Sequence, residues 1–209
     1  LAMGRQERSK VLRALNEKEE PESAHAFLLK LGYWDEMVNP YPARLEMPTA
    51  DPDVPLPALP DEARRDLTHL PAFAIDDEGN QDPDDALSWE GEDFPNGRLW
   101  VHIADVAALV PPDSPADLEA RARAANLYLP EGTIHMLPPA ATAVLALGLS
   151  ELSPALSFAL AVSPAGEVTL TEIVPSWVRV TRLTYAQAEE RLTDEPLAQL
   201  LAAAQVFTA

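Results

Sequence analysis

The chain has 209 residues, of which 47% are hydrophobic, enough for one sizeable core or for a small domain joined to a larger one. It contains no cysteine, which excludes disulfides, thiolate metal sites and a cysteine nucleophile and fits a reducing cytoplasm. The formal net charge of −19 comes from 34 acidic and 15 basic residues, and such a charge repels a polyanion unless cations or basic sequence elsewhere compensate for it.

The amino-terminal sequence does not predict a signal peptide. Charged residues occupy the positions where the apolar core of such a peptide would begin. They are Arg5, Glu7, Arg8 and Lys10. The longest apolar stretch, residues 140–149, is about half of what spanning a bilayer requires. We therefore expect a soluble, cytoplasmic protein that does not contact a membrane.

Residues 5–31 predict two short helices, the second of which opens at Pro21 and ends before Gly32. Prolines recur so often between residues 38 and 62 that regular helix and central strand are excluded there. We therefore expect a helical element over 1–37, a proline-rich connector over 38–62 and a larger domain over 63–209.

The larger domain begins with strand signals. The apolar run 72–75 and the alternating pattern 98–104 both predict strands. Ser114 and Asp117 have capping-box spacing, which predicts a helix running from there towards Tyr128. The apolar side of this helix is expected to consist of Leu118, Ala122 and Ala125.

A hairpin is predicted farther along, where residues 156–162 and 168–174 flank a turn. Residues 177–183 predict a third strand, and Thr184 is expected to cap a helix that runs through Leu192. This order of elements predicts an α+β domain with a mixed sheet and flanking helices. Because the chain opens on leucine and ends within a helical pattern, we expect a fragment of a longer protein.

An acidic cluster carries the chemistry. Between residues 76 and 97 there are nine acidic residues and no lysine or arginine, so this segment repels itself unless protons or cations neutralise it. Four of the carboxylates lie close together in the sequence, bracketed by apolar residues. They are Asp76, Asp82, Asp84 and Asp85. Aspartate oxygens suit magnesium, and two such ions roughly 3.5–4 Å apart can activate a water and stabilise the departing oxygen of a phosphodiester.

Other interpretations of the cluster are a solvated acidic loop and a calcium loop. The twelve-residue EF-hand pattern fails, because its sixth position would be Gln81 or Leu87 instead of glycine. Zinc is not expected, because the histidines show none of the usual ligand spacings. The histidines are His25, His69, His102 and His135.

The spacing Ile75-Asp76, five residues, then Asp82-Pro83-Asp84-Asp85-Ala86 resembles the signature of the ribonuclease II and ribonuclease R (RNB) family, whose members have four aspartates at this spacing. Further motifs that are similar to those of the family occur in the same order. They are Val101–Val106, Tyr128-Leu129, Met136-Leu137-Pro138 and Leu183-Thr184-Tyr185. The resemblance covers about residues 63–195, the first half of the family's catalytic domain, and the helical start is similar to the winged-helix-like front of some bacterial members.

The resemblance implies a magnesium-dependent hydrolytic exoribonuclease, with manganese as an alternative ion. Such an enzyme removes nucleotides from the 3′ end of single-stranded RNA and releases nucleoside 5′-monophosphates. It also implies that four residues hold the metal and carry the catalysis, and among these we expect Asp84 to have the most direct role. The four are Asp76, Asp82, Asp84 and Asp85.

Two tyrosines are expected to bind RNA by the same resemblance. Tyr128 matches the family tyrosine that stacks against the terminal nucleotide, and Tyr185 is similar to one that lines the RNA path; a core role at a helix end is the alternative for each. The strand pattern suggests that His102 and Asp105 support the acidic loop from below, with Asp105 hydrogen-bonded rather than metal-bound.

Two other functions stay open. A catalytically silent RNB-like protein that binds RNA or serves as a scaffold is one, although retention of all four aspartates opposes it. The other is an acidic module that binds calcium or a basic protein, which the net charge of −19 favours and the ordered motifs oppose. No particular protein partner is predicted.

Overall fold

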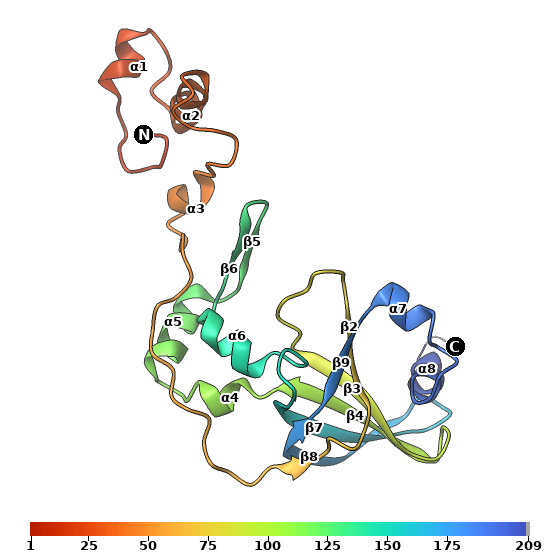
Figure 1. Ribbon diagram of the computed structural model, residues 1–209. Coiled ribbons are helices and arrows are strands. Elements are labelled where there is room, and N and C mark those ends of the chain that lie inside the picture. Colours follow the sequence, from red (N-terminus) through yellow and green to blue (C-terminus); the bar gives the residue numbers. More distant parts are fainter. Residues whose placement is uncertain (208–209) are drawn as a thin grey trace. The chain divides into compact units, whose positions relative to one another are not determined.

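The computed structural model describes residues 1–207. The chain forms two compact units, one made of Leu1–Pro55 with Pro115–Pro138, the other of Leu56–Ser114 with the chain from Pro139 onward. The α+β class is confirmed, because the second unit holds a mixed sheet with helices and a small helical element precedes it in the chain (Figure 1). Within residues 1–207, no helix is both long enough and apolar enough to cross a bilayer.

The first unit is mostly helical and has a small apolar core. Its elements are α1 Lys10–Ala14, α2 Pro21–Lys30, α3 Tyr41–Arg44, α5 Pro115–Arg123, β5 Leu127–Leu129 and β6 Gly132–Ile134. Leu12 of α1 and Ala24 of α2 are buried together with Ala2. The side chain of Ser9 caps α1 by accepting a hydrogen bond from the Leu12 N–H at 3.3 Å. The two helices predicted over residues 5–31 are therefore confirmed.

One short helix lies inside the segment 38–62, where the proline content predicted none. α3 carries Pro42 in its first turn, where a helix has no intrahelical partner for the backbone N–H that proline lacks. The exclusion of helix was therefore wrong at this turn. Residues 45–64 contain neither helix nor strand, as predicted.

The helix predicted to run towards Tyr128 ends earlier. α5 stops at Arg123, because Ala124 adopts a left-handed conformation with φ of +67° and cannot continue a right-handed helix. Tyr128 pairs instead with Thr133 in the β5–β6 hairpin. Its predicted place at a helix end was therefore wrong.

The apolar side of α5 also differs from the expectation. Its buried residues are Ala116 and Ala120, whereas Leu118 is 54% exposed. The predicted buried face, which included Leu118, was therefore wrong: the face that is buried is a different side of the same helix. Residues 115–138 belong to the same compact unit as the amino-terminal helices, although the sequence grouped them with the larger domain.

The second unit is built on a seven-stranded mixed sheet with the order β1-β8-β7-β4-β3-β2-β9. Its strands are β1 Arg65–Asp66, β2 Ala72–Asp76, β3 Asp85–Gly91, β4 Gly97–Ala104, β7 Ser153–Val162, β8 Val168–Val178 and β9 Val180–Thr184. The pairs β1–β8 and β2–β9 are parallel, and the four others are antiparallel. The predicted strands 72–75 and 98–104 and the predicted hairpin correspond to β2, β4 and β7–β8 and are confirmed.

The segment predicted as a third strand is divided, because β8 extends to Val178 and β9 begins at Val180. Thr184 then caps α7 as expected. Its hydroxyl accepts from the Gln187 N–H at 3.2 Å while the Gln187 side chain accepts from the Thr184 N–H at 2.9 Å, a reciprocal capping box. α7 ends at Glu189, short of the predicted Leu192.

Helices of the second unit cover part of the sheet. They are α4 Val106–Leu109, α6 Pro139–Leu145, α7 Tyr185–Glu189 and α8 Leu197–Gln205. Leu197 and Leu200 of α8 pack against Phe73 of β2 and Trp89 of β3 in one buried cluster. Burying an apolar side chain of this size contributes about 1.5–3 kcal/mol. This packing fixes β2 and β3, the two strands that flank the acidic loop.

Candidate active site

The acidic loop, residues 77–84, connects β2 to β3, and both of its ends belong to the sheet. Asp76 is the last residue of β2 and pairs with Thr184 of β9. Asp85 is the first residue of β3 and pairs with Ile103 of β4. Asp82 and Asp84 lie in the loop between these strands. The sheet therefore fixes the backbone of the first and last of the four aspartates.

Backbone hydrogen bonds also hold the end of the loop. The Ala104 N–H donates to the Asp84 carbonyl at 2.8 Å, and the Leu147 N–H donates to the Pro83 carbonyl at 2.8 Å. Pro83 is buried, whereas the side chains of Asp84 and Asp85 are exposed. The backbone at Asp84 is thus tied to neighbouring segments while its carboxylate reaches solvent.

Asp76 accepts hydrogen bonds on both oxygens. Oδ1 accepts from the Asp77 N–H at 2.8 Å, and Oδ2 accepts from the side-chain amide of Asn80. The carbonyl oxygen of the same Asn80 side chain accepts from the Asp82 N–H at 3.1 Å. Asn80 thus connects two of the four aspartates, and the sequence analysis did not identify it.

The carboxylates influence one another electrostatically. Partial removal of water raises the pKa of the Asp85 carboxyl, and the nearby negative charges of Asp84 and then Asp76 raise it further. Three of the four aspartates are therefore close enough for their charges to repel. A bound cation would relieve this repulsion.

The donor set fits magnesium in kind, because carboxylate oxygens are the ligands that this hard ion prefers. In the described part of the chain, however, no three or more side chains of histidine, cysteine, aspartate or glutamate converge closely enough to hold a metal ion. The aspartates thus supply suitable atoms, and their side chains would have to rotate to share one ion.

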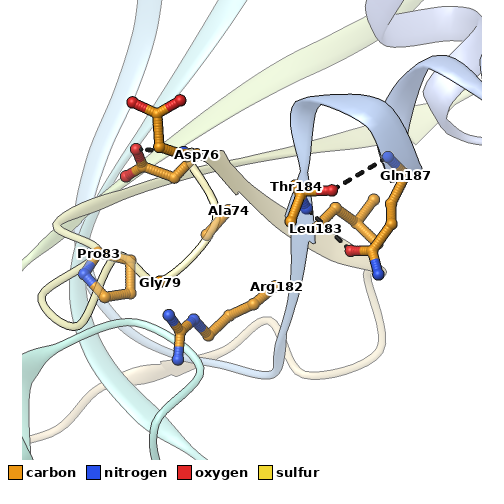
Figure 2. A pocket seen from close by; sticks show the side chains of 9 residues that line it. Ala74, Asp76, Gly79, Pro83, Arg182, Leu183, Thr184 and Gln187 are labelled. Carbon is orange, nitrogen blue, oxygen red and sulfur yellow. Dashed lines mark hydrogen bonds between the residues drawn. The ribbon is translucent and has the colours of Figure 1, made fainter.

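A small pocket adjoins the loop on the β9 side. It is lined by Ala74, Asp76, Asp77, Gly79, Pro83, Arg182, Leu183, Thr184 and Gln187. Figure 2 shows the side chain of Arg182 extending from β9 towards Gly79 and Pro83. The guanidinium of Arg182 donates to the backbone carbonyl of Asn80. Arg182 directly precedes the motif Leu183-Thr184-Tyr185, and this position is the one signal in the sequence that could have indicated it.

The two tyrosines expected to bind RNA belong to different compact units. Tyr185 is the first residue of α7 and is 60% exposed. It follows Thr184, the residue that pairs with Asp76. Tyr128 lies in β5 of the first unit, is 71% exposed, and accepts a hydrogen bond from the Asn126 side chain at 3.3 Å. Both rings are therefore accessible to a ligand.

His102 lies within the sheet and is completely buried. Its Nε2 is 2.8 Å from the Ser88 hydroxyl and its Nδ1 is 2.7 Å from the Ser157 hydroxyl, which is 2.6 Å from that of Ser176. We call these four side chains the serine–histidine ladder. Burial lowers the pKa of His102 to about 4. The imidazole is therefore neutral at pH 7, and the ladder connects β3, β4, β7 and β8.

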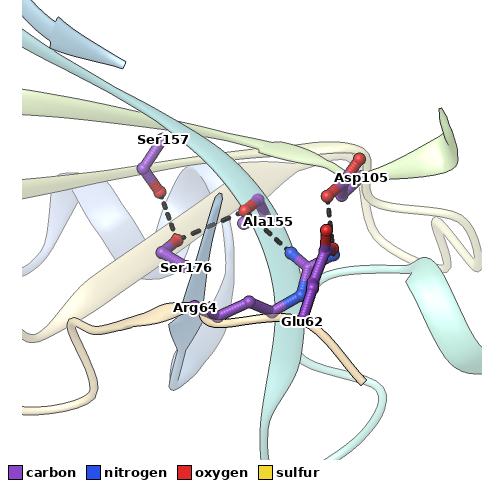
Figure 3. A network of polar contacts seen from close by, with 6 residues as sticks. All are labelled: Glu62, Arg64, Asp105, Ala155, Ser157 and Ser176. Atoms are coloured by element: carbon purple, nitrogen blue, oxygen red, sulfur yellow. Dashed lines mark hydrogen bonds and ion pairs between the residues drawn. The ribbon is translucent and has the colours of Figure 1, made fainter. Parts of the chain in front are cut away.

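Asp105 follows β4 and takes part in a polar network that joins the ladder at the Ala155 carbonyl, which also accepts from the Ser176 hydroxyl at 3.4 Å (Figure 3). Its Oδ2 accepts from the guanidinium of Arg64 at 2.8 Å. The same guanidinium contacts Glu62 and donates to the Ala155 carbonyl at 3.4 Å. The side chain of Arg64 is 2% exposed, and its guanidinium carbon lies 5.6 Å from the centre of the Trp177 ring. Arg64 was not predicted from the sequence, because Asp105 and Ala155 lie 41 and 91 positions away from it.

Comparison with known families gives two matches. The model described as "RNB domain" matches residues 64–205, and the one described as "Double HTH domain" matches residues 2–40. An uncharacterized ribonuclease of Synechocystis is 38% identical over 93% of this chain and 32% of its own length. The chain thus spans about a third of that relative, and 24% of the chloroplastic/mitochondrial ribonuclease II of Arabidopsis thaliana, to which it is 32% identical over 87% of this chain.

Solved structures share the fold. RNase R of Mycoplasma genitalium, in complex with ribose-methylated single-stranded RNA, matches with a TM-score of 0.61 and 24% identity over 69% of this chain and 24% of that one. Yeast Ssd1, described as a pseudonuclease, matches with a TM-score of 0.60 and 24% identity over 90% of this chain and 24% of that one. Since the RNB model covers most of the 209 residues, the chain belongs to the RNB family.

Proposed function

We propose that this chain contributes the metal-binding part of a magnesium-dependent hydrolytic 3′-to-5′ exoribonuclease, which acts on single-stranded RNA and releases nucleoside 5′-monophosphates. One observation carries the proposal: β2 and β3 hold the two ends of the acidic loop, so that Asp76 and Asp85 are fixed at the edges of a segment that also carries Asp82 and Asp84. All four aspartates of the family signature are retained. The absence of cysteine fits a cytoplasmic enzyme.

Magnesium, or manganese in its place, would be held by the four aspartates, Asp76, Asp82, Asp84 and Asp85. When bound, such ions supply an activated water and stabilise the departing 3′ oxygen. The chain's own contribution is position. The sheet fixes the backbone of Asp76 and Asp85, and the Ala104 N–H donates to the backbone carbonyl of Asp84 at 2.8 Å. Of the four, we propose Asp84 for the most direct role in catalysis.

RNA would be bound by stacking. The rings of Tyr128 and Tyr185 are 71% and 60% exposed, and stacking of a base on an aromatic ring contributes about 1–3 kcal/mol without sequence preference. His102 and Asp105 would support the loop through the serine–histidine ladder and the Arg64 network and would not touch the substrate.

A second candidate is a catalytically silent RNB protein that binds RNA or acts as a scaffold. The fold match to yeast Ssd1, described as a pseudonuclease, favours it. A third candidate, an acidic module that binds calcium or a basic protein, is favoured by the net charge of −19. Both candidates predict that RNA stays intact when magnesium is added.

The test is degradation of 5′-labelled single-stranded RNA in the presence of magnesium. The 209-residue chain is compared with a longer protein that adds the region present in its relatives, and with the Asp84→Asn variant of that protein. A ladder that shortens from the 3′ end and disappears in the variant supports the proposal. Intact RNA with both magnesium and manganese in the longer protein would refute it and favour the silent relative.

A further inference from the structure

The side chain of Asn80 contacts two of the four aspartates at once. Its amide nitrogen donates to Oδ2 of Asp76, and its carbonyl oxygen accepts from the Asp82 N–H at 3.1 Å. A side-chain amide carries a donor and an acceptor on the same planar group. A carboxylate at this position would lack the donor, and an aliphatic side chain would lack both.

Arg182 fixes Asn80 from the other side. Its guanidinium donates to the backbone carbonyl of Asn80. Arg182 lies on β9, paired with Ala74 two residues before Asp76, so it is held by the strand that also flanks the first aspartate. Figure 2 shows this side chain extending towards the loop. Through Arg182, the backbone of Asn80 is therefore anchored to the sheet by a contact from outside the loop.

We propose that Asn80, held by Arg182, is a positioning residue that fixes Asp76 relative to Asp82 for binding of a divalent cation. This inference rests on the proposed function. Each carboxylate oxygen of Asp76 accepts one hydrogen bond, from the Asp77 N–H and from Asn80 respectively, and each oxygen has a second lone pair that can face a cation. Orienting the carboxylate beforehand reduces the ordering that cation binding must impose.

If Asn80 blocked the cation site instead of positioning Asp76, removing its side chain would change the cation affinity in the opposite direction. If the amide of Asn80 occupied the place of the cation, its removal would free Asp76 and strengthen cation binding. A positioning role predicts weaker binding, because a freed Asp76 carboxylate rotates. The direction of the change in affinity therefore distinguishes the two.

Magnesium affinity of the 209-residue chain, measured by isothermal titration calorimetry, tests the inference without any RNA. Asn80→Ala is expected to weaken binding about 10- to 100-fold, the usual effect of removing a partner that orients a ligand. Arg182→Met is expected to weaken it less, and Arg182→Lys to recover part of the loss. Two variants serve as controls with no expected change: Gln81→Ala, exposed in the same loop, and Arg179→Met, whose guanidinium pairs with Glu151 at 2.9 Å.

Hydrogen exchange without metal gives a second readout. The Asp82 N–H, which donates to Asn80, is expected to exchange faster in Asn80→Ala and in Arg182→Met than in the native chain and in Gln81→Ala. If the native chain binds magnesium and Asn80→Ala binds it equally or more tightly, the inference is wrong while the proposed function stands. If the native chain binds no magnesium, the inference is wrong, and the RNA assay with the longer protein decides the proposed function separately. If Asn80→Ala does not fold, the Arg182→Met and Arg182→Lys pair decides by the same criteria.

Discussion

The serine–histidine ladder and the acidic loop show two ways in which this unit handles polar groups. In the ladder, four buried side chains from four neighbouring strands satisfy one another at 2.6–2.8 Å. In the loop, burial and then the negative charges of Asp84 and Asp76 raise the pKa of Asp85. The ladder is complete without a ligand, whereas, on the proposed function, a bound cation would stabilise the loop.

This difference separates polar groups that specify the fold from polar groups that are available to bind a ligand. Buried polar groups that are fully paired specify one arrangement of strands. Clustered charges of one sign, such as those of the acidic loop, destabilise a folded chain unless protons or a bound cation neutralise them. Changes in the ladder should therefore act on stability, and changes in the loop on binding and activity.

The largest expected effect is on activity. Asp84→Asn in the longer protein should lower the rate of RNA degradation by on the order of 10²- to 10³-fold, as when one group that stabilises a transition state is removed. Thermal unfolding of the variant should be unchanged or slightly higher, because Asp84 is exposed and its charge raises the pKa of Asp85. A parallel fall in melting temperature would mean that Asp84 has a structural role instead.

Removing Arg64 should have the largest effect on stability. Arg64→Met leaves Asp105 unpaired at a position where both side chains are mostly buried, and breaking a buried ion pair costs about 3–5 kcal/mol of unfolding free energy. Urea denaturation measures the loss. Its matched control is Arg65→Met, whose surface pair with Glu172 at 2.6 Å should contribute far less, because solvent screens it. Equal losses in the two variants would contradict a special role for Arg64.

His102 should make stability depend on pH. Its pKa is lowered from 6.5 to about 4 in the folded chain, so the unfolded chain binds the proton more tightly. The contribution of neutral His102 is therefore complete above pH 6.5 and decreases as pH falls towards 4, by about 3 kcal/mol in total.

Urea denaturation between pH 7 and 4 tests this dependence. Carboxylates titrate in part of the same range, so the informative quantity is the difference between the native chain and His102→Gln, which should have a flatter profile. His69→Gln, at an exposed position, should keep the native profile. A profile that is the same in all three proteins would rule out His102 as the source.

Local signals in the sequence predicted much of this scaffold. β2 and β4 follow apolar runs and alternation, and the capping box at Thr184 joins residues three positions apart. Nonlocal features were missed. Arg64 pairs with Asp105, which lies 41 positions farther along the chain, and Arg182 donates to Asn80, which lies 102 positions before it. Periodic patterns in a sequence carry no information about contacts at such separations.

The site was predicted as a motif and not as a geometry. The spacing of the four aspartates indicated a metal site, but the contacts of Asn80 depend on how the loop turns between β2 and β3. Tyr128 was placed on a helix because the left-handed residue Ala124 leaves no signal in an alanine-rich sequence. Its pairing with Thr133 depends on a two-stranded hairpin that helical periodicity obscures.

A smaller effect is expected at Thr184, which pairs with Asp76 at the start of the acidic loop. Thr184→Ala removes the side chain that caps α7 and should lower the free energy of unfolding by about 1 kcal/mol. Thr184→Ser retains the hydroxyl and should be close to native. Urea denaturation of both variants separates the cap from the loss of a methyl group, since a large loss in Thr184→Ser would point to packing.

The smallest effect should come from Asp85, because solvent reaches its side chain and screens the charge. Its pKa is raised above the ordinary value of 3.8, so the folded chain holds this proton more tightly than the unfolded chain. Ionised Asp85 therefore lowers the free energy of unfolding. This loss is absent well below pH 3.8, develops as pH rises through the folded pKa, and is complete at neutral pH. Asp85→Asn should therefore melt at a slightly higher temperature than the native chain at pH 7 and at an equal temperature at low pH.

Magnesium should reverse the order of the melting temperatures of the native chain and Asp85→Asn at pH 7. A bound cation neutralises the same carboxylates and stabilises the native chain in proportion to its occupancy, whereas the Asn variant has lost one ligand oxygen and the negative charge of the carboxylate. Saturating magnesium should therefore raise the melting temperature of the native chain more than that of Asp85→Asn. If the Asn variant melts lower than the native chain in the absence of metal, Asp85 contributes a stabilising contact and the charge repulsion in the loop is not what a cation relieves.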